Sequence, residues 1–370
     1  MLDKEKERTT DRKYGIDLLR MLLMFMVVVL HVQGKGGILK NAEIGSVNYY
    51  LAWIIEISCY CAVNCYALIT GYVYYSNKYR ISSLLMICLQ TVLYSISIHV
   101  VFWIIDPSRI SFGQLLNAFF PVSRHTHWYV SAYAGLFILI PILNTAVQSF
   151  SLYQTKRFLL LSFVAFSLIT TFLMEDPYTF AGGYSTLWLA YLYLIGGFIK
   201  KYHWESYLTQ KNALLVFALC IALTLGFKFS VDSVTLHLFG EPKFGNLLAN
   251  YVSPTIIIAG IALFIKFLRL CPNAKTCSFL RTLSPAAFGV YLIHCHPYLF
   301  ELLSDRFVFL IDWNPLTMPF GVIAFSMAIY LPCLLVDYLR LKLFKMLHIK
   351  ECLEKLENRL SSSVFDSTSS

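Results

Sequence analysis

The most constraining feature of the sequence is an apolar run of membrane-spanning length, residues 14–34, that contains three ionisable residues. A helix of about 20 residues crosses a lipid bilayer. Because a charge at that depth is costly, such residues mark a functional interior by default. Asp17, Arg20 and His31 share one stripe, since an α-helix turns by about 100° per residue. Asp17 and Arg20 lie one turn apart and can pair, and His31 stands roughly 16 Å further along the axis.

The rest of the chain predicts an all-α integral membrane protein. Of its 370 residues, 58% are hydrophobic and only 14% are charged, whereas soluble domains average about 25% charged residues. The first run has no small-residue cleavage site after it, so we interpret it as a retained helix and not as a signal peptide. About ten transmembrane helices are expected, at residues 16–33, 49–73, 81–104, 128–148, 157–174, 184–199, 212–230, 247–268, 285–303 and 319–340.

Lysine and arginine are distributed unevenly between the loops, and this predicts that both termini are cytoplasmic. With the N-terminus inside, the cytoplasmic segments hold 22 of these residues and the opposite segments hold 6. This bias follows the positive-inside rule. We therefore attribute the net charge of +9 to membrane orientation and not to nucleic-acid binding. The expected location is the plasma membrane, crossed several times.

Three parts are expected along the chain. Residues 1–15 form a cytoplasmic N-terminal segment, and residues 16–340 form the transmembrane domain. Residues 341–370 form a cytoplasmic tail, in which a basic amphipathic stretch predicts a membrane-surface helix and a Ser-rich end predicts disorder.

The cysteines and histidines do not predict a metal site. Most of the ten cysteines lie inside apolar runs and none shows zinc-finger spacing, so neither a disulfide framework nor a metal cluster is expected. His294 and His296 are two residues apart and point about 160° away from each other on a helix. We therefore assign no metal and no bound cofactor.

A cationic and aromatic cluster precedes the fourth expected span. It contains Arg124, His125, His127, Trp128 and Tyr129. Such side chains can stack on a sugar face and bind its hydroxyl or acidic groups. An interfacial anchor belt would explain the aromatic residues alone, but it explains two histidines and an arginine less easily. The cluster is therefore a candidate acceptor-binding site.

Two further residues stand out inside expected spans. Glu56 lies near the depth of His31 and can pair with His31 or with Arg124, or it can extend to the interface. His294 lies near mid-membrane, where an imidazole needs a partner. Glu56 is thus a second acceptor-binding candidate, and His294 is a further candidate site residue.

The first helix predicts a transfer reaction across the membrane. An arginine open to the cytoplasm can hold a phosphate or polarise a carbonyl. A histidine nearer the other face can act as general base or as acyl acceptor. Together they suit a donor that arrives from inside, such as an acyl-CoA, and an acceptor that waits outside.

The chain resembles acyltransferase family three, the integral-membrane proteins that O-acetylate bacterial cell-surface polysaccharides. The likeness runs in order from about residue 12 to residue 340. It rests on these elements: G-I-D-L-L-R with ten further residues before His31, T-G-Y at 70–72, H-W-Y at 127–129 with I-P-I-L-N at 140–144, L-I-G-G-F at 194–198, and Y-L-I-H at 291–294.

This resemblance implies ten helices, acetyl-CoA as the co-substrate, and a cell-surface glycan as the acceptor. It implies that His31 is catalytic and that Arg20, beside Asp17, acts in the donor channel. N-K-Y-R stands where the family often carries Arg-x-x-Arg. The donor-binding residues implied on this side are Lys78, Arg80, Gly71 and Tyr72, although plain helix packing is an alternative role for Gly71.

Two other classes of function remain open. In a transporter or flippase, the intramembrane histidine and arginine would line a substrate path, although we detect no related halves. A non-enzymatic partner of a polysaccharide assembly complex would need neither residue. Within the enzyme hypothesis, the acceptor glycan or lipid-linked sugar, the length of the acyl group and a covalent acyl-histidine step stay open.

Overall fold

The computed structural model describes residues 12–75 and 79–366, and no β-strand occurs among them. The predicted all-α class is therefore confirmed. The α-helices are α2 (Tyr14–Gln33), α3 (Ile38–Asn41), α4 (Val47–Cys59), α5 (Ala62–Tyr74), α6 (Ile81–Ile105), α7 (Phe112–Asn117), α8 (Trp128–Ser149), α9 (Leu152–Phe163), α10 (Thr170–Leu173), α11 (Thr186–Lys201), α12 (Gln210–Phe239), α13 (Pro254–Leu268), α14 (Ala274–Leu283), α15 (Ala287–His294), α16 (Pro297–Glu301), α17 (Met318–Met346) and α18 (Ile349–Asp366). Short 3₁₀ or π turns are η1 (Pro107–Arg109), η2 (Val164–Ile169), η3 (Ala181–Gly183), η4 (Trp204–Ser206), η5 (Ser284–Ala286) and η6 (Val308–Asp312).

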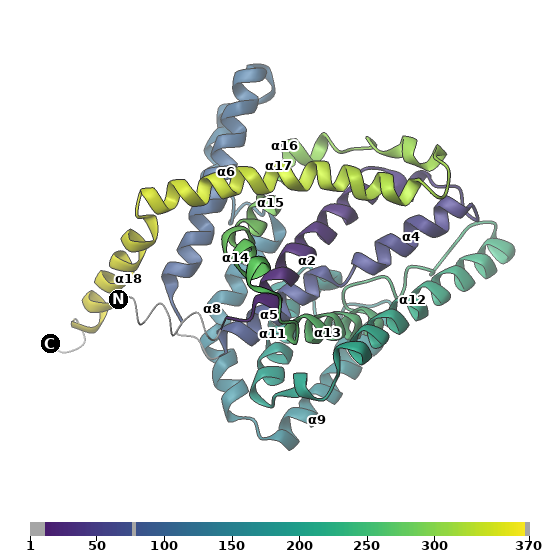
Figure 1. The fold of residues 1–370 in the computed structure, drawn as a ribbon, viewed down its shortest axis with the longest axis horizontal. Coiled ribbons are helices and arrows are strands. Elements are labelled where there is room, and N and C mark those ends of the chain that lie inside the picture. The colour runs from purple at the N-terminus through teal and green to yellow at the C-terminus, as the bar shows by residue number, and fades with distance from the viewer. Residues whose placement is uncertain (1–11, 76–78, 367–370) are drawn as a thin grey trace.

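Helix α2 lies in the middle of the bundle, as Figure 1 shows in purple. It packs against α4, α5, α13, α15 and α17. Leu19, Leu23 and Val28 of α2 are fully buried. The most apolar stretch of the first span is 67% buried, against 22% for that of α12. Helix α2 is therefore an inner helix of the bundle, whereas most residues in the corresponding stretch of α12 are not buried.

Seven helical segments in the described part of the chain are long and apolar enough to cross a membrane. This supports a multi-pass membrane protein. The expected count of ten is not confirmed, because α11, α13 and α15 fall on three expected spans but have only 16, 15 and 8 residues. The seven segments are Tyr14–Asn41, Val47–Tyr74, Ile81–Ile105, Trp128–Ser149, Leu152–Leu173, Gln210–Phe239 and Met318–Met346.

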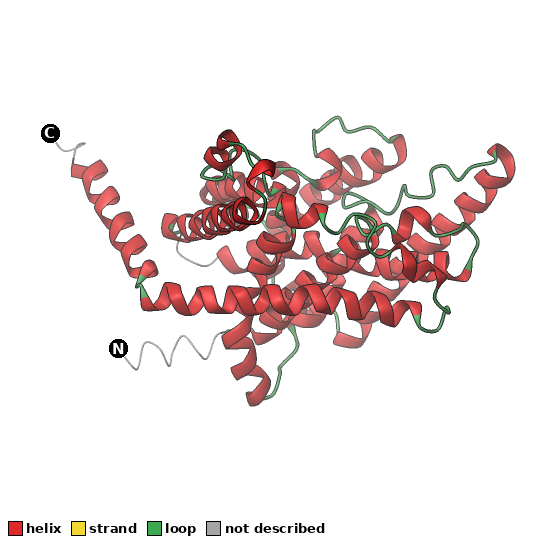
Figure 2. Cartoon of the chain, turned by 90° about the horizontal axis from the view of Figure 1, so that it is seen from above, coloured by secondary structure: helices red, strands yellow, loops and turns green. Residues whose placement is uncertain are grey.

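Interruptions inside two expected spans place backbone turns near the centre of the bundle. The second span breaks between α4 and α5, around Tyr60 and Cys61. The ninth span breaks after His294, because Pro297 starts a new helix at its first position. By contrast, α17 runs unbroken along one side of the molecule (Figure 2).

The C-terminal helix α18 docks on the start of α6. The Glu357 carboxylate accepts hydrogen bonds from the backbone N–H groups of Ile81 (2.7 Å) and Ser82 (3.4 Å). Burial raises the pKa of Glu357, but these bonds and nearby Arg80 outweigh it and hold the pKa below its usual value. Arg80 also pairs with Glu354 at 2.9 Å. The amphipathic tail thus forms a helix that caps α6, and the last residues, 367–370, lie outside the described part.

Two glycines bring the backbones of α5 and α11 into contact. A Cβ atom on Gly71 would overlap the carbonyl oxygen of Tyr193, and one on Gly196 would overlap that of Leu68. Small residues at helix contacts permit such close approach inside membranes. Gly71 therefore has a packing role, which was the alternative to donor binding.

We predict that Gly71→Ala lowers the thermal stability of the purified protein in detergent. The added methyl group has no rotamer that avoids the backbone of α11, and overpacking costs about 1–3 kcal/mol. Gly226→Ala is the matched control, since a Cβ atom there meets nothing within 4 Å. An unchanged unfolding temperature for Gly71→Ala would contradict the close contact.

Candidate functional site

The polar side chains of α2 face two cavities. His31, with Gly34 and Lys35, lines a cavity of about 180 Å³, which we name the His31 cavity. Asp17 and Arg20 line a cavity of about 370 Å³, the Arg20 cavity. The ionisable residues that share one face of α2 therefore line two separate cavities, with Asp17 and Arg20 at one and His31 at the other.

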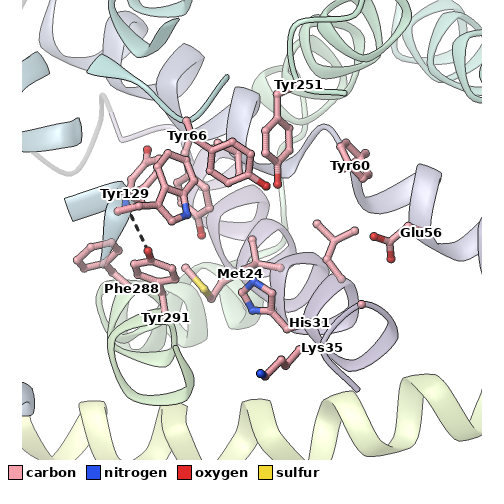
Figure 3. Close-up of a pocket in the computed structure, with 16 residues that line it drawn as sticks. Met24, His31, Lys35, Glu56, Tyr60, Tyr66, Tyr129, Tyr251, Phe288 and Tyr291 are labelled. Carbon is pink, nitrogen blue, oxygen red and sulfur yellow. Dashed lines mark hydrogen bonds between the residues drawn. The ribbon is translucent and has the colours of Figure 1, made fainter. Parts of the chain in front are cut away.

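One wall separates these cavities. Tyr66, Tyr129 and Phe288 line both of them. Tyr66 is fixed because its hydroxyl donates a 2.7 Å hydrogen bond to the carbonyl oxygen of Arg20. Tyr129 is held by its backbone N–H, which donates to the Tyr291 hydroxyl at 3.3 Å, drawn as a dashed line in Figure 3. The shared wall is thus aromatic, and Tyr66 ties it to α2 whereas Tyr129 ties it to α15.

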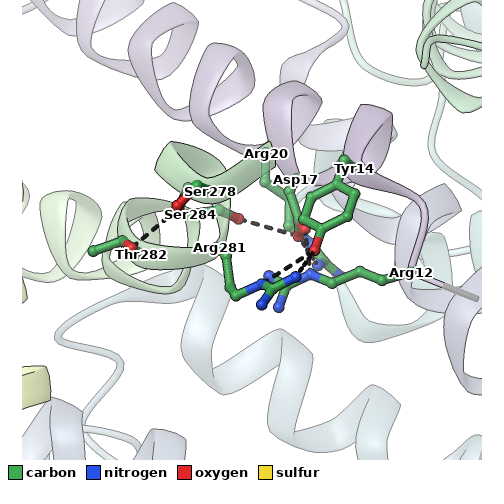
Figure 4. Close-up of polar contacts among 8 residues, drawn as sticks. All are labelled: Arg12, Tyr14, Asp17, Arg20, Ser278, Arg281, Thr282 and Ser284. Atoms are coloured by element: carbon green, nitrogen blue, oxygen red, sulfur yellow. Dashed lines mark hydrogen bonds and ion pairs between the residues drawn. The ribbon is translucent and has the colours of Figure 1, made fainter. Parts of the chain in front are cut away.

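At the Arg20 cavity, the carboxylate of Asp17 organises two guanidinium groups (Figure 4). Arg12 Nε lies 2.6 Å from Oδ2 and Arg20 Nη1 lies 3.3 Å from Oδ1. Ser284 donates a third hydrogen bond to Oδ1 at 3.2 Å. Asp17 is buried, whereas the two arginine side chains are 36% and 35% exposed. The arginines can therefore meet an anion, and Asp17 cannot.

A further arginine lies beside this group. Arg281 donates to the Tyr14 hydroxyl through Nε at 3.1 Å and Nη2 at 2.6 Å. Arg281 and Arg12 both contact the ring of Tyr14, with their Cζ atoms 5.9 Å and 5.4 Å from its centroid (Figure 4). Three arginines near one cavity mouth suit a ligand with several phosphate groups, because guanidinium binds phosphate in a bidentate manner.

At the other end of α2, His31 is bonded to a second imidazole. His31 Nδ1 lies 2.9 Å from His294 Nε2, and His294 Nδ1 lies 2.6 Å from the carbonyl oxygen of Val290. A carbonyl only accepts, so His294 Nδ1 carries a proton and, in the neutral ring, Nε2 accepts. His31 must then donate through Nδ1, which leaves a lone pair on its Nε2. The arrangement prepares His31 to accept a proton.

The His31 cavity is lined mainly by aromatic rings, and Figure 3 shows Tyr60, Tyr66, Tyr129 and Tyr251 facing the same space as His31. Glu56 supplies a carboxylate on this wall and is 6% exposed. Its Oε2 accepts a 3.3 Å hydrogen bond from Gln33, on α2. Aromatic faces with a buried acceptor group suit a sugar and its hydroxyl groups.

The predicted acceptor-binding residues divide between the cavity and other places. Glu56 and Trp128 line the His31 cavity. Arg124 is exposed in the preceding loop and is not part of the cavity wall. His127 is buried, with Nε2 3.0 Å from the carbonyl oxygen of Leu292, and it does not line the cavity.

The residues implied on the donor side are not gathered at the Arg20 cavity, apart from Arg20 itself. Tyr72 is buried, with its hydroxyl 3.4 Å from Glu205 and its ring 5.5 Å from that of Phe264. Gly71 packs on α11, and Arg80 pairs with α18, as described above. Lys78 lies outside the described residues.

Several site residues were not singled out from the sequence. Tyr66 and Phe288 form the shared wall, and Cys295 touches both histidines through its Sγ atom. Tyrosines are common in this chain, which has 24 of them, so an individual one carries little information. The position of Tyr291 within the Y-L-I-H element, and that of Cys295 directly after it, were the only available indication.

Comparison with known families gives one match over most of the chain. The model of a family described as an acyltransferase domain matches residues 13–337. This range includes α2, the residues of the shared wall, and all residues that line the two cavities except Arg12. Neither a comparison with curated proteins nor one with solved structures found a match.

We predict that Asp17→Asn destabilises the protein by about 1–3 kcal/mol. Breaking a buried ion pair costs about 3–5 kcal/mol, and partial exposure of both arginines reduces that figure. Thermal unfolding in detergent measures the effect, with exposed Glu43→Gln as the control. Equal unfolding temperatures for the two variants would show that Asp17 does not hold this end of α2 together.

Proposed function

The chain belongs to acyltransferase family 3, and we propose that it moves an acetyl or longer acyl group from cytoplasmic acyl-CoA to an extracytoplasmic hydroxyl. Acetyl-CoA is the proposed co-substrate, and the acceptor is a cell-surface glycan or a lipid-linked sugar. The observation that carries the proposal is the pair of cavities on one helix, with arginines at one and an imidazole at the other.

The proposed orientation places both termini and the Arg20 cavity on the cytoplasmic side of the plasma membrane. The excess of lysine and arginine in the segments assigned to that side supports it. Residues 16–340 then form the catalytic membrane domain, flanked by the N-terminal segment 1–15 and the tail 341–370. The family match to residues 13–337 agrees with a domain of this extent.

In the proposed donor site, Arg12 and Arg20 bind the phosphate groups of CoA and Asp17 orients both guanidinium groups. The thin pantetheine arm carries the thioester toward the shared wall of Tyr66, Tyr129 and Phe288. An arginine beside the thioester carbonyl can also stabilise the negative charge that develops on its oxygen.

In the proposed reaction, an acceptor hydroxyl lies in the His31 cavity near Glu56 and Trp128. His31 Nε2 takes the hydroxyl proton while the oxygen attacks the thioester carbonyl carbon. The carbon–sulfur bond then breaks, and CoA leaves as a thiolate that takes the proton from His31 Nε2, which returns His31 to its neutral form. His294 acts as a positioning residue, since its hydrogen bond fixes the ring of His31. If His31 is acylated first, Nε2 attacks the same carbonyl and the hydroxyl displaces the acyl group afterwards.

We predict that His31→Ala and Arg20→Ala each lower acyl transfer by on the order of 100-fold or more, because each removes a group that acts in the transition state. The measurement uses purified protein in detergent with radiolabelled acetyl-CoA, and follows CoA release and label on the protein. His237→Ala and Arg157→Ala are matched controls at exposed positions. Size-exclusion profiles and unfolding temperatures establish that all variants are folded.

The outcomes separate the classes of function. Label that stays on wild-type protein and is lost in His31→Ala supports the covalent route, and CoA release without label supports direct transfer. Neither donor binding nor turnover by folded wild-type protein would favour a transporter or a non-enzymatic membrane protein. Full activity of His31→Ala would contradict its catalytic role.

We predict that Phe288→Ala raises hydrolysis of acetyl-CoA relative to transfer. The phenyl ring lines both cavities, and its removal admits water to the thioester. CoA release with and without an acceptor measures the ratio of the two reactions. Phe309→Ala is the control, since Phe309 is exposed and lines neither cavity. An unchanged ratio would argue against a sealing role of the wall.

A further inference from the structure

Three potential metal ligands lie close together at the edge of the His31 cavity, which His31 itself lines. His31 Nδ1 and His294 Nε2 lie 2.9 Å apart, and Cys295 Sγ lies 3.5 Å from the first and 3.3 Å from the second. The three atoms form a compact triangle. The proposed reaction uses the two imidazoles but not the thiol.

The triangle has nearly the size that a tetrahedral zinc ion requires. Zinc binds imidazole nitrogen at about 2.0–2.1 Å and cysteine sulfur at about 2.3 Å, which separates two nitrogens by about 3.3 Å and nitrogen from sulfur by about 3.6 Å. The observed nitrogen–sulfur separations differ from this by a few tenths of an ångström or less. The nitrogens need to move apart by about 0.4 Å, a shift within reach of small ring rotations.

The surroundings of His294 resemble those of a metal-ligating histidine. Its Nδ1 donates to the carbonyl oxygen of Val290, and its Nε2 forms one corner of the triangle. Metal-bound histidines almost always donate their other ring N–H to a carbonyl or carboxylate, which fixes the ring. His294 is also buried, at 3% exposure, so its ring has little freedom to turn away.

We propose that His31, His294 and Cys295 bind a zinc-like divalent ion, and that the bound ion blocks the base function of His31. The inhibitory part of this inference, that the ion blocks the base function of His31, rests on the proposed function. Cys295 binds as a thiolate and releases one proton. His31 gives Nδ1 to the metal, so the ring proton resides on Nε2, where the lone pair is needed for catalysis. Three protein ligands leave the fourth position for water.

The ion class follows from the donor set. Two imidazoles and one thiolate suit zinc and other borderline ions such as cobalt, whereas magnesium and calcium prefer oxygen ligands. His31 is partly exposed on the His31 cavity, so an ion can reach the triangle from there. The expectation of no metal site rested on cysteine spacing and on the angle between His294 and His296, whereas His31 and Cys295 are 264 residues apart in the chain.

The first experiment measures metal binding without donor or acceptor. Full-length protein in detergent is treated with a chelator, titrated with Co²⁺, and followed by its thiolate-to-cobalt charge-transfer absorption. We expect one tight Co²⁺ per chain in wild type, displaced by Zn²⁺. Cys295→Ser should remove the band, and His294→Gln should weaken binding by at least about 10-fold.

Cys88→Ser is the matched control, because it makes the same change in a membrane helix away from the triangle. It should bind Co²⁺ as wild type does. A band of equal strength in Cys295→Ser, or no band in folded wild type, would overturn the metal site whatever the enzymatic activity.

The second experiment tests inhibition. Micromolar Zn²⁺ should abolish acyl transfer by wild type and by Cys88→Ser, and a chelator should restore it. Cys295→Ser should retain acyl transfer at Zn²⁺ concentrations that fully inhibit the wild-type protein. If Co²⁺ binds as expected but no acyl transfer occurs under any condition, the proposed function fails and the metal site stands. If Zn²⁺ binds at the triangle and transfer continues unchanged, the inhibitory role is overturned.

Discussion

A polar side chain inside a bilayer needs a partner from the protein, because lipid offers none, and the structure is arranged around this requirement on α2. Burying the Asp17 carboxylate without partners would cost a large amount of free energy. Two guanidinium groups and a serine hydroxyl surround it. The imidazole of His31 likewise has a hydrogen-bond partner, His294. Two of these partners, Ser284 and His294, lie in η5 and α15, so their hydrogen bonds tie both elements to α2.

The same rule operates away from the candidate site. Asp337 on α17 accepts hydrogen bonds from Gln90, Tyr94 and Arg340, and it is fully buried. This network joins α6 to α17, as interhelical hydrogen bonds commonly do in membranes. Buried charge thus identifies where helices are tied together as well as where chemistry occurs. What distinguishes α2 is that its ionisable groups line two cavities that share one aromatic wall.

The sequence alone predicted the fold class and the ionisable residues of α2. Both follow from helical periodicity and from the free-energy cost of placing a charge in a membrane, which can be judged from the residues of a single helix. The pairing of Asp17 with Arg20 needed only helical geometry. The partner of His31 was out of reach, since His294 lies 263 residues away and nothing in either segment specifies the contact. Tertiary contact likewise decided the position of Arg80, which pairs with α18. Apolar run length alone does not separate a full span from a short buried helix, so the number of spans was not determined.

The glycine contact between α5 and α11 has a mechanical consequence. Where two backbones touch, no side-chain rearrangement can absorb a displacement, so these helices move as one body. The Arg20 cavity is bounded by Ile69 and Thr70 of α5 and, on another side, by Ile87 and Gln90 of α6. The wall that α5 contributes to this cavity is therefore backed by the backbone of α11, so a change in the shape of the Arg20 cavity requires movement of the other elements around it.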